Sequence, residues 1–190
     1  MDNDRSATIN IGGQQHELIL TTKATKEIAR RYGGLENLGD KLLKSENFEI
    51  ALDEIIWLIT LLANQSILIH NLKNKEAPKD VLTEDEVELL TSPLELATYK
   101  SAITEAMFKG TKRNIESEDN SKNRGRVSDD ELFTRLLYYG TVHLNRTEEE
   151  TWLTPLGLLM DLWDCHRQFL GLASRKRELF IEDIIPEGLN

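Results

Sequence analysis

Cysteine is almost missing from the chain, which contains only Cys165 among its 190 residues. A single thiol cannot form an internal disulfide, so nothing indicates an oxidising compartment, and we expect a cytoplasmic location. The first residues also lack the basic and apolar regions of a secretory signal. The most apolar stretch, residues 55–69, contains Asn64 and Gln65, and it is shorter than the roughly 20 residues of a membrane span. We therefore expect neither export nor a membrane partner.

Basic charge is also scarce. The chain has 23 Lys and Arg residues against 33 Asp and Glu residues, which gives a net charge of −10. Nucleic-acid phosphates and anionic lipids repel a protein of this charge. The composition thus predicts that the chain binds no nucleic acid.

Signatures of enzyme chemistry are absent from the sequence. It contains neither GxGxxG nor GxxxxGK[ST], and its four histidines have no HExxH motif and no second cysteine beside them. We therefore expect no catalytic residue, no cofactor and no metal. Asp161, Cys165 and His166 form the one suggestive cluster, but consecutive side chains diverge by about 100° on a helix. We interpret them as a buried thiol, a surface acid and a partly buried imidazole.

Apolar residues account for only 39% of the chain. The shortage is sharpest in residues 110–127, where only Ile115 and Val127 are apolar. Such a segment buries too little surface to offset the entropy of ordering its backbone. We interpret it as a flexible polar linker between an N-terminal module, residues 1–109, and a small C-terminal helical module, residues 128–190.

The remaining patterns predict a mainly α-helical fold. Residues 7–20 form two short apolar runs around Gly12 and Gly13, which is typical of a β-hairpin. Capping boxes at Thr83 and Ser128 predict helix starts, and Gly33 and Gly110 predict helix ends. The expected helices cover residues 22–32, 35–44, 48–71, 84–90, 93–109, 129–142 and 155–170.

Two of these helices, residues 48–71 and 155–170, are apolar around most of their circumference and must be covered on most sides. Either their own modules wrap them, or a partner or a second copy covers them, and both alternatives stay open. Coverage by a second copy predicts a homo-oligomer. A partner surface favours large apolar side chains. The candidate partner-binding residues are Trp57, Leu61, Leu68, Trp152, Leu156, Leu159, Trp163 and Phe169.

Three segments carry a family resemblance: HELILTTKATKEIARRYGGLENLGDKL, WLTPLGLLMDLWDCHRQF and KRELFIEDIIPEG. They resemble the tail assembly chaperones of long-tailed, siphovirus-type bacteriophages and prophages of Gram-positive bacteria. The resemblance covers both modules and skips the linker. It implies a non-enzymatic factor of the host bacterial cytoplasm, absent from the mature virion, that binds tape measure protein and recruits tail tube protein. The linker lies where the long family form, made by ribosomal frameshifting, would have its junction.

A second interpretation uses the acidic charge instead. The chain could be a helical adaptor or inhibitor that binds a basic host protein through its carboxylates. Salt screens exposed charges, so binding of that kind should weaken at high ionic strength, whereas an interface of tryptophan and leucine should depend much less on salt.

Overall fold

The computed structural model describes residues 5–34, 37, 48–115 and 128–172. It confirms the mainly α-helical class with an N-terminal two-stranded hairpin. Strands β1 (Ala7–Ile11) and β2 (Gln14–Leu18) pair antiparallel. Gly12 and Gly13 between them adopt φ of 57° and 84°, as a two-residue hairpin turn requires.

Helix α1 (Thr22–Tyr32) follows the hairpin, and both of its ends confirm the sequence pattern. The Thr21 side chain accepts a hydrogen bond from the Ala24 N–H, and Gly33 closes the helix with φ of 70°. The short helix predicted over residues 35–44 lies outside the described residues.

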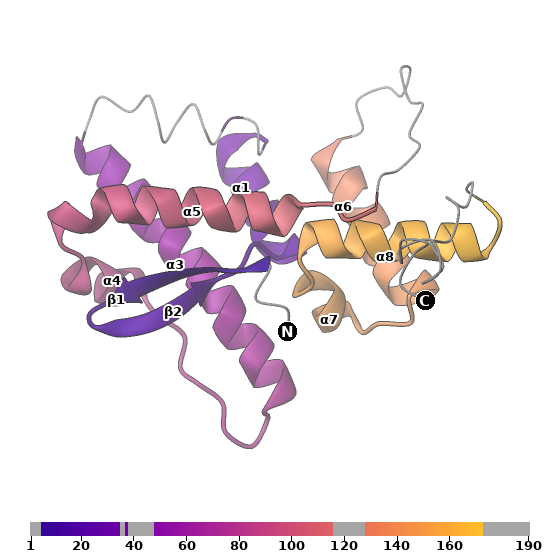
Figure 1. Ribbon diagram of the computed structural model, residues 1–190, viewed down its shortest axis with the longest axis horizontal. Helices are drawn as coiled ribbons and strands as arrows, with labels where there is room; N and C mark the ends of the chain where they lie inside the picture. The colour runs from indigo at the N-terminus through magenta and orange to yellow at the C-terminus, as the bar shows by residue number, and fades with distance from the viewer. Residues whose placement is uncertain (1–4, 35–36, 38–47, 116–127, 173–190) are drawn as a thin grey trace, which may run out of the picture.

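The long helix α3 (Phe48–Lys73) runs through the core of the N-terminal half, which comprises β1 to α5 (Figure 1). Its Ile55, Leu58, Ile59 and Leu62 are fully buried. Strand β2, helix α4 (Glu84–Leu90) and helix α5 (Leu96–Thr111) pack against α3. Of the two alternatives for covering α3, its own module or a partner, the first is therefore correct for this face.

Asparagines on α3 hold the loop that leads to α4. Asn64 both donates to the Leu82 carbonyl and accepts from the Leu82 N–H, each at 2.8 Å. Asn71, two helical turns later, makes the same pair of hydrogen bonds with Lys79 at 2.9 and 2.8 Å. The polar strip of an otherwise apolar helix is thus used to fix residues 79–82.

By length and composition, one helix of the described residues could cross a membrane. It is the Leu52–Lys73 stretch of α3, whose mean hydropathy is 1.5 and of which half is buried inside the protein. The apolar run at residues 55–69 is too short for a span, but α3 extends past both of its ends, and the longer stretch reaches the length of one. Buried core helices have the same composition as membrane spans.

Two features of α4 and α5 test the predicted boundaries. The capping box of Thr83 and Glu86 is confirmed. The prediction that Gly110 ends a helix is wrong, because α5 continues through it to Thr111. A Cβ atom at Gly110 would lie 2.5 Å from the Leu20 Cβ. This glycine therefore permits close packing of α5 on the chain that follows β2.

The C-terminal half consists of α6 (Asp129–Tyr138), the π-helical turn η3 (Tyr139–His143), α7 (Glu148–Trp152) and α8 (Leu156–Phe169). Ser128 and Thr147 cap α6 and α7, and Gly171, with φ of 70°, lies just beyond the end of α8. The core of this half contains Phe133, Leu136 and Leu159. Ala29 of α1 completes that core, so the two halves share apolar contacts.

The halves are also joined by hydrogen bonds, which corrects the predicted domain organisation. Thr22 donates to the Thr154 carbonyl from its N–H at 2.9 Å and from its hydroxyl at 2.8 Å. A linker that begins at residue 110 is wrong, since residues 110 and 111 belong to α5, and residues 112–115 bond to Arg5 and to α8. Residues 116–127 lie outside the described residues.

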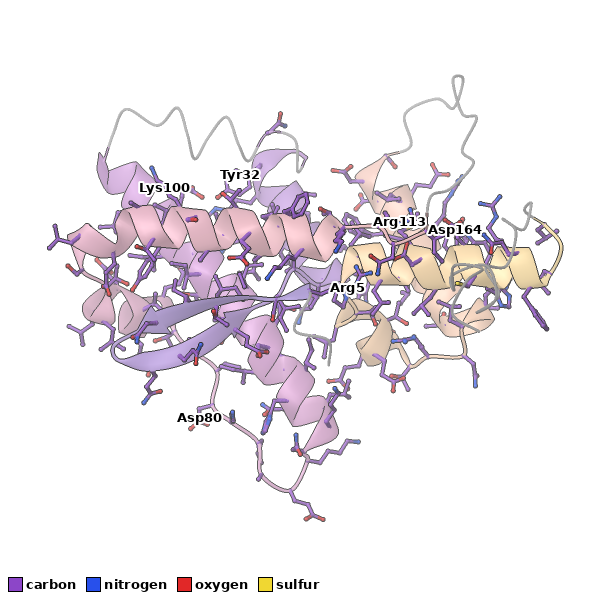
Figure 2. All side chains as sticks on the ribbon, in the orientation of Figure 1. Arg5, Tyr32, Asp80, Lys100, Arg113 and Asp164 are labelled. Atoms are coloured by element: carbon purple, nitrogen blue, oxygen red, sulfur yellow. The ribbon has the colours of Figure 1, made fainter. Side chains whose placement is uncertain are left out.

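Asp161 of α8 is the centre of this junction. One carboxylate oxygen accepts from the Arg113 Nε at 2.8 Å and the Ile115 N–H at 3.3 Å. The other accepts from Arg5 at 3.1 Å and the Asn114 N–H at 2.9 Å. Figure 2 shows Arg5, Arg113 and Asp164 gathered where the end of α5 meets α8. Burial alone would raise the pKa of Asp161, but the hydrogen bonds from Asn114, Arg113 and Ile115 hold it below its usual range.

Candidate partner-binding surfaces

Three of the predicted partner-binding residues contribute mainly to the protein's own cores. Leu159 is 0% exposed beside Phe133 and Leu136, so its prediction as a contact residue is wrong. Leu61 and Leu156 are half-buried and pack against the N-terminal and C-terminal cores, respectively. Helical periodicity placed these side chains on apolar stripes but could not say that a neighbouring helix covers each stripe.

Trp57 is half-buried in contacts with α1. The Arg31 guanidinium lies 4.2 Å from the centre of its ring, and the Tyr32 ring meets it edge-on at 6.0 Å. Arg31 pairs with Glu54 at 3.1 Å, and Tyr32 donates its hydroxyl hydrogen to the same carboxylate. Burial, and then this hydrogen bond, raise the pKa of Tyr32 above its usual range. Trp57 thus helps to hold α1 on α3.

Leu68 and Trp152, far apart in the sequence, line one groove between α1, α3 and α7. Its volume is about 520 Å³. The α1 wall carries Lys23, Lys26 and Arg30 together with Glu27, so it is basic on balance, and the α7 wall carries Glu148 and Glu149. Lys26 Nζ lies 4.8 Å from the centre of the Trp152 ring, whose Nε1 donates to Glu148 at 3.2 Å. The groove therefore combines an apolar centre with walls of opposite charge.

Trp163 belongs to a cluster of rings that α6, η3 and α8 bring together. Its ring stacks on Tyr139 at 4.1 Å with an interplanar angle of 4°. The His143 ring lies 5.0 Å from both Trp163 and Tyr138, and His166 lies 5.4 Å from His143. We name this cluster, together with Phe169, the aromatic surface: Tyr138, Tyr139, His143, Trp163, His166 and Phe169.

Phe169 is the most exposed aromatic side chain of this surface, at 76%. It follows His166 by three residues and therefore lies on the same side of α8. Tyr138, Val142, Leu170 and Leu172 are also exposed. The end of α8 thus presents a concentration of solvent-exposed apolar side chains, which is typical of an interaction site.

Sequence reasoning missed Tyr138, Tyr139 and His143 as parts of this surface. Tyr139 and His143 are four residues apart, a spacing that places side chains together on an α-helix. However, η3 is a π-helical turn, which inserts an extra residue and rotates the exposed face. No local pattern in residues 139–143 marks that turn, so only the structure locates the face.

A leucine surface lies on the N-terminal half and was not predicted either. Leu89 of α4 is 86% exposed, and Leu94 of the 3₁₀ turn η2 (Pro93–Glu95) is 91% exposed. Leu90 beside them is also exposed. Figure 1 shows α4 at one end of the long axis of the molecule and the end of α8 at the other. The leucine surface and the aromatic surface therefore face different ends.

The structure places Asp161, Cys165 and His166 differently from what the sequence led us to expect. Cys165 is exposed and Asp161 is buried, the reverse of what we expected. The Asp161 carboxylate is occupied by Arg5 and Arg113, while His166 contacts the rings of His143 and Trp163. Within the part of the chain that the structure describes, no three His, Cys, Asp or Glu residues are placed to hold a metal ion.

Comparison with known proteins adds no relative: no family model, characterised protein or solved structure matches the chain. The resemblance found in the sequence therefore stays a prediction.

Proposed function

We propose that the chain is a bacteriophage tail assembly chaperone that binds tape measure protein and recruits tail tube protein in the host cytoplasm. It performs no catalysis and leaves the assembly before the virion matures. The observation that supports this proposal best is the pair of exposed apolar surfaces at opposite ends of the molecule. A factor that brings two partners together needs two such separate surfaces.

The aromatic surface is the proposed contact for tail tube protein. Tryptophan and tyrosine are enriched among the residues that dominate binding energy. Stacking on Tyr139 and contact with His143 hold Trp163 in place before a partner arrives. Because an ordered side chain loses little rotamer freedom on binding, this arrangement lowers the entropic cost of association.

The leucine surface is the proposed contact for tape measure protein. Leu89 and Leu94 lie within six residues of each other, in and just after α4. Burying exposed leucine side chains against a partner contributes about 25 cal/mol per Å² of apolar area. This assignment replaces Trp57 and Leu61, whose contacts are largely made within the chain.

The experiment is co-expression of the full chain with the tape measure and tail tube proteins encoded beside its gene, followed by size-exclusion chromatography with light scattering. We expect each partner to elute in a stoichiometric complex, and the measured mass also tests the predicted homo-oligomer. Phe169→Ala should reduce capture of tail tube protein by tenfold or more, or about 1.4 kcal/mol.

Phe108→Ala is the matched control, because Phe108 is a phenylalanine of similar exposure, 70%, on α5 of the other half. Both variants should fold normally, since neither side chain is part of a core. Equal capture by the two variants would remove the aromatic surface from the proposal. Separate elution of all three proteins would overturn the chaperone function itself.

An acidic adaptor that binds a basic host protein is the second candidate. It is favoured by three exposed acidic clusters at the starts of α4, α6 and α7: residues 84–86, 129–131 and 148–150. Such binding should weaken steeply as salt rises. A complex that survives high salt would support the apolar surfaces instead.

A further inference from the structure

The groove between α1, α3 and α7 remains unused by the proposed chaperone contacts. It is built from both halves of the chain, with Leu68 of α3 and Trp152 of α7 at its apolar centre. Lys23, Lys26 and Arg30 outweigh Glu27 and give the α1 wall a net positive charge, although the chain as a whole carries −10. An occupant that fits this groove needs apolar side chains flanked by charges of both signs.

We propose that residues 175–185 of this same chain occupy the groove. The segment begins with Arg175, Lys176 and Arg177, continues with Leu179, Phe180 and Ile181, and then carries Glu182 and Asp183. Its order of basic, apolar and acidic residues complements an acidic wall on α7, an apolar centre and a basic wall on α1. Charge complementarity of this kind determines the orientation of a bound segment.

The length of the chain allows this return. Residues 173–190 lie outside the described structure, and Leu172, the last described residue, comes three residues after Phe169, where α8 ends. The 14 residues of α8 cover about 21 Å, at 1.5 Å per residue. Residues 173–178 can extend over roughly 20 Å, at about 3.3–3.6 Å per residue. Leu179 can therefore reach the start of α8, and Trp152 lies only four residues before that start.

The binding is also favourable on physical grounds. Leu179, Phe180, Ile181, Ile184 and Ile185 form an apolar group that is costly to leave in water. Because the segment is tethered to α8, its local concentration at the groove is high and a weak contact suffices. In this arrangement Glu182 and Asp183 would meet the Lys26 ammonium, which lies 4.8 Å from the centre of the Trp152 ring.

The three tryptophans of the chain provide a direct test, because their indole N–H signals report separate places. Trp152 lines the groove, Trp57 packs on α1 and Trp163 belongs to the aromatic surface. The full chain is prepared with ¹⁵N-labelled tryptophan, Cys165→Ser and Ile184→Cys, and a nitroxide is attached at residue 184. We compare each indole signal with its intensity after the nitroxide has been chemically reduced. We expect the Trp152 signal to lose most of its intensity, while the Trp57 and Trp163 signals keep theirs.

Charge reversal of the groove tests the same contact. Lys26→Glu in the labelled chain should restore the Trp152 signal, whereas Lys100→Glu, a change of the same type on α5, should not. Signal loss at Trp163 in place of Trp152 would put the segment on the aromatic surface and overturn the proposal. An unchanged Trp152 signal would overturn it as well.

A mixing experiment separates binding within one chain from binding between chains. Chains with ¹⁵N but no nitroxide are mixed with unlabelled chains that carry the nitroxide. We expect the Trp152 signal of the mixture to stay intact. Loss of that signal would show that the segment belongs to a second copy, which contradicts occupation by the same chain.

Discussion

The two halves of the molecule differ in how they are stabilised. In the N-terminal half, α3 passes between strands and helices that bury Ile55, Leu58, Ile59 and Leu62 completely. Among the described residues, the C-terminal half buries Phe133, Leu136 and Leu159 in its own core with Ala29 of α1, and it packs Leu153 against Ile19 and Ile69 of the N-terminal half. A core of that size contributes little stability by itself. The comparison shows that the C-terminal half depends on its contact with the N-terminal half.

The junction compensates for the small core with polar contacts. Asp161 receives hydrogen bonds from the N-terminal Arg5 and from three donors in residues 113–115. Gly157 of α8 permits this approach, because a Cβ there would lie 2.2 Å from the Lys112 carbonyl oxygen. Substitutions in the junction and in each core can therefore show which contacts contribute most to the stability of the C-terminal half.

The largest effect should come from Leu159→Ala. Removing a fully buried leucine costs about 2–5 kcal/mol, and the small C-terminal core has few other contacts to retain its structure. We expect amide hydrogen exchange to accelerate strongly in α6 to α8 and much less in β1, β2 and α3.

Leu62→Ala, the same change in the core of the N-terminal half, is the matched control. It should accelerate exchange in both halves, because the C-terminal half depends on α1. Unchanged protection of α6 to α8 in Leu62→Ala would mean that the C-terminal half is stable by itself.

Asp161→Asn should have the next largest effect. Loss of hydrogen bonds to a charged group costs about 1.5–3 kcal/mol, and the partly buried Arg5 and Arg113 would lose their common partner. We expect a lower unfolding temperature for α6 to α8, measured by hydrogen exchange as a function of temperature. Glu131→Gln removes a carboxylate whose ion pair with Arg135 is exposed, and it should change the unfolding temperature very little. Similar results for both variants would contradict a special role for Asp161.

The smallest effect should be a pH dependence of the junction. Since its donors lower the folded-state pKa of Asp161, the ionised carboxylate contributes its full stability above the ordinary value of 3.8. That contribution is lost as the pH falls below 3.8 and through the lower folded-state pKa. The unfolding free energy of the native chain should therefore fall more steeply with acid than that of Asp161→Asn. Parallel curves would mean that Asp161 does not control the junction.

Local patterns in the sequence predicted the elements well. Gly12 and Gly13 form the hairpin turn, Thr83 and Ser128 cap helices, and Gly33 ends α1. Each of these features depends on a few neighbouring residues, whose backbone conformations and hydrogen bonds follow from residue type. For the same reason, the mainly α-helical class could be read before the structure was known.

The sequence by itself thus determined where helices and turns form and which side chains share a helical face. Only the tertiary structure decided which faces are covered: Leu159 became core, Leu68 and Trp152 came together in a groove, and Gly110 served packing instead of ending a helix. It also joined residues 113–115 to α8. The physical reason is that periodicity describes one element at a time, whereas burial depends on contacts between residues distant in the sequence.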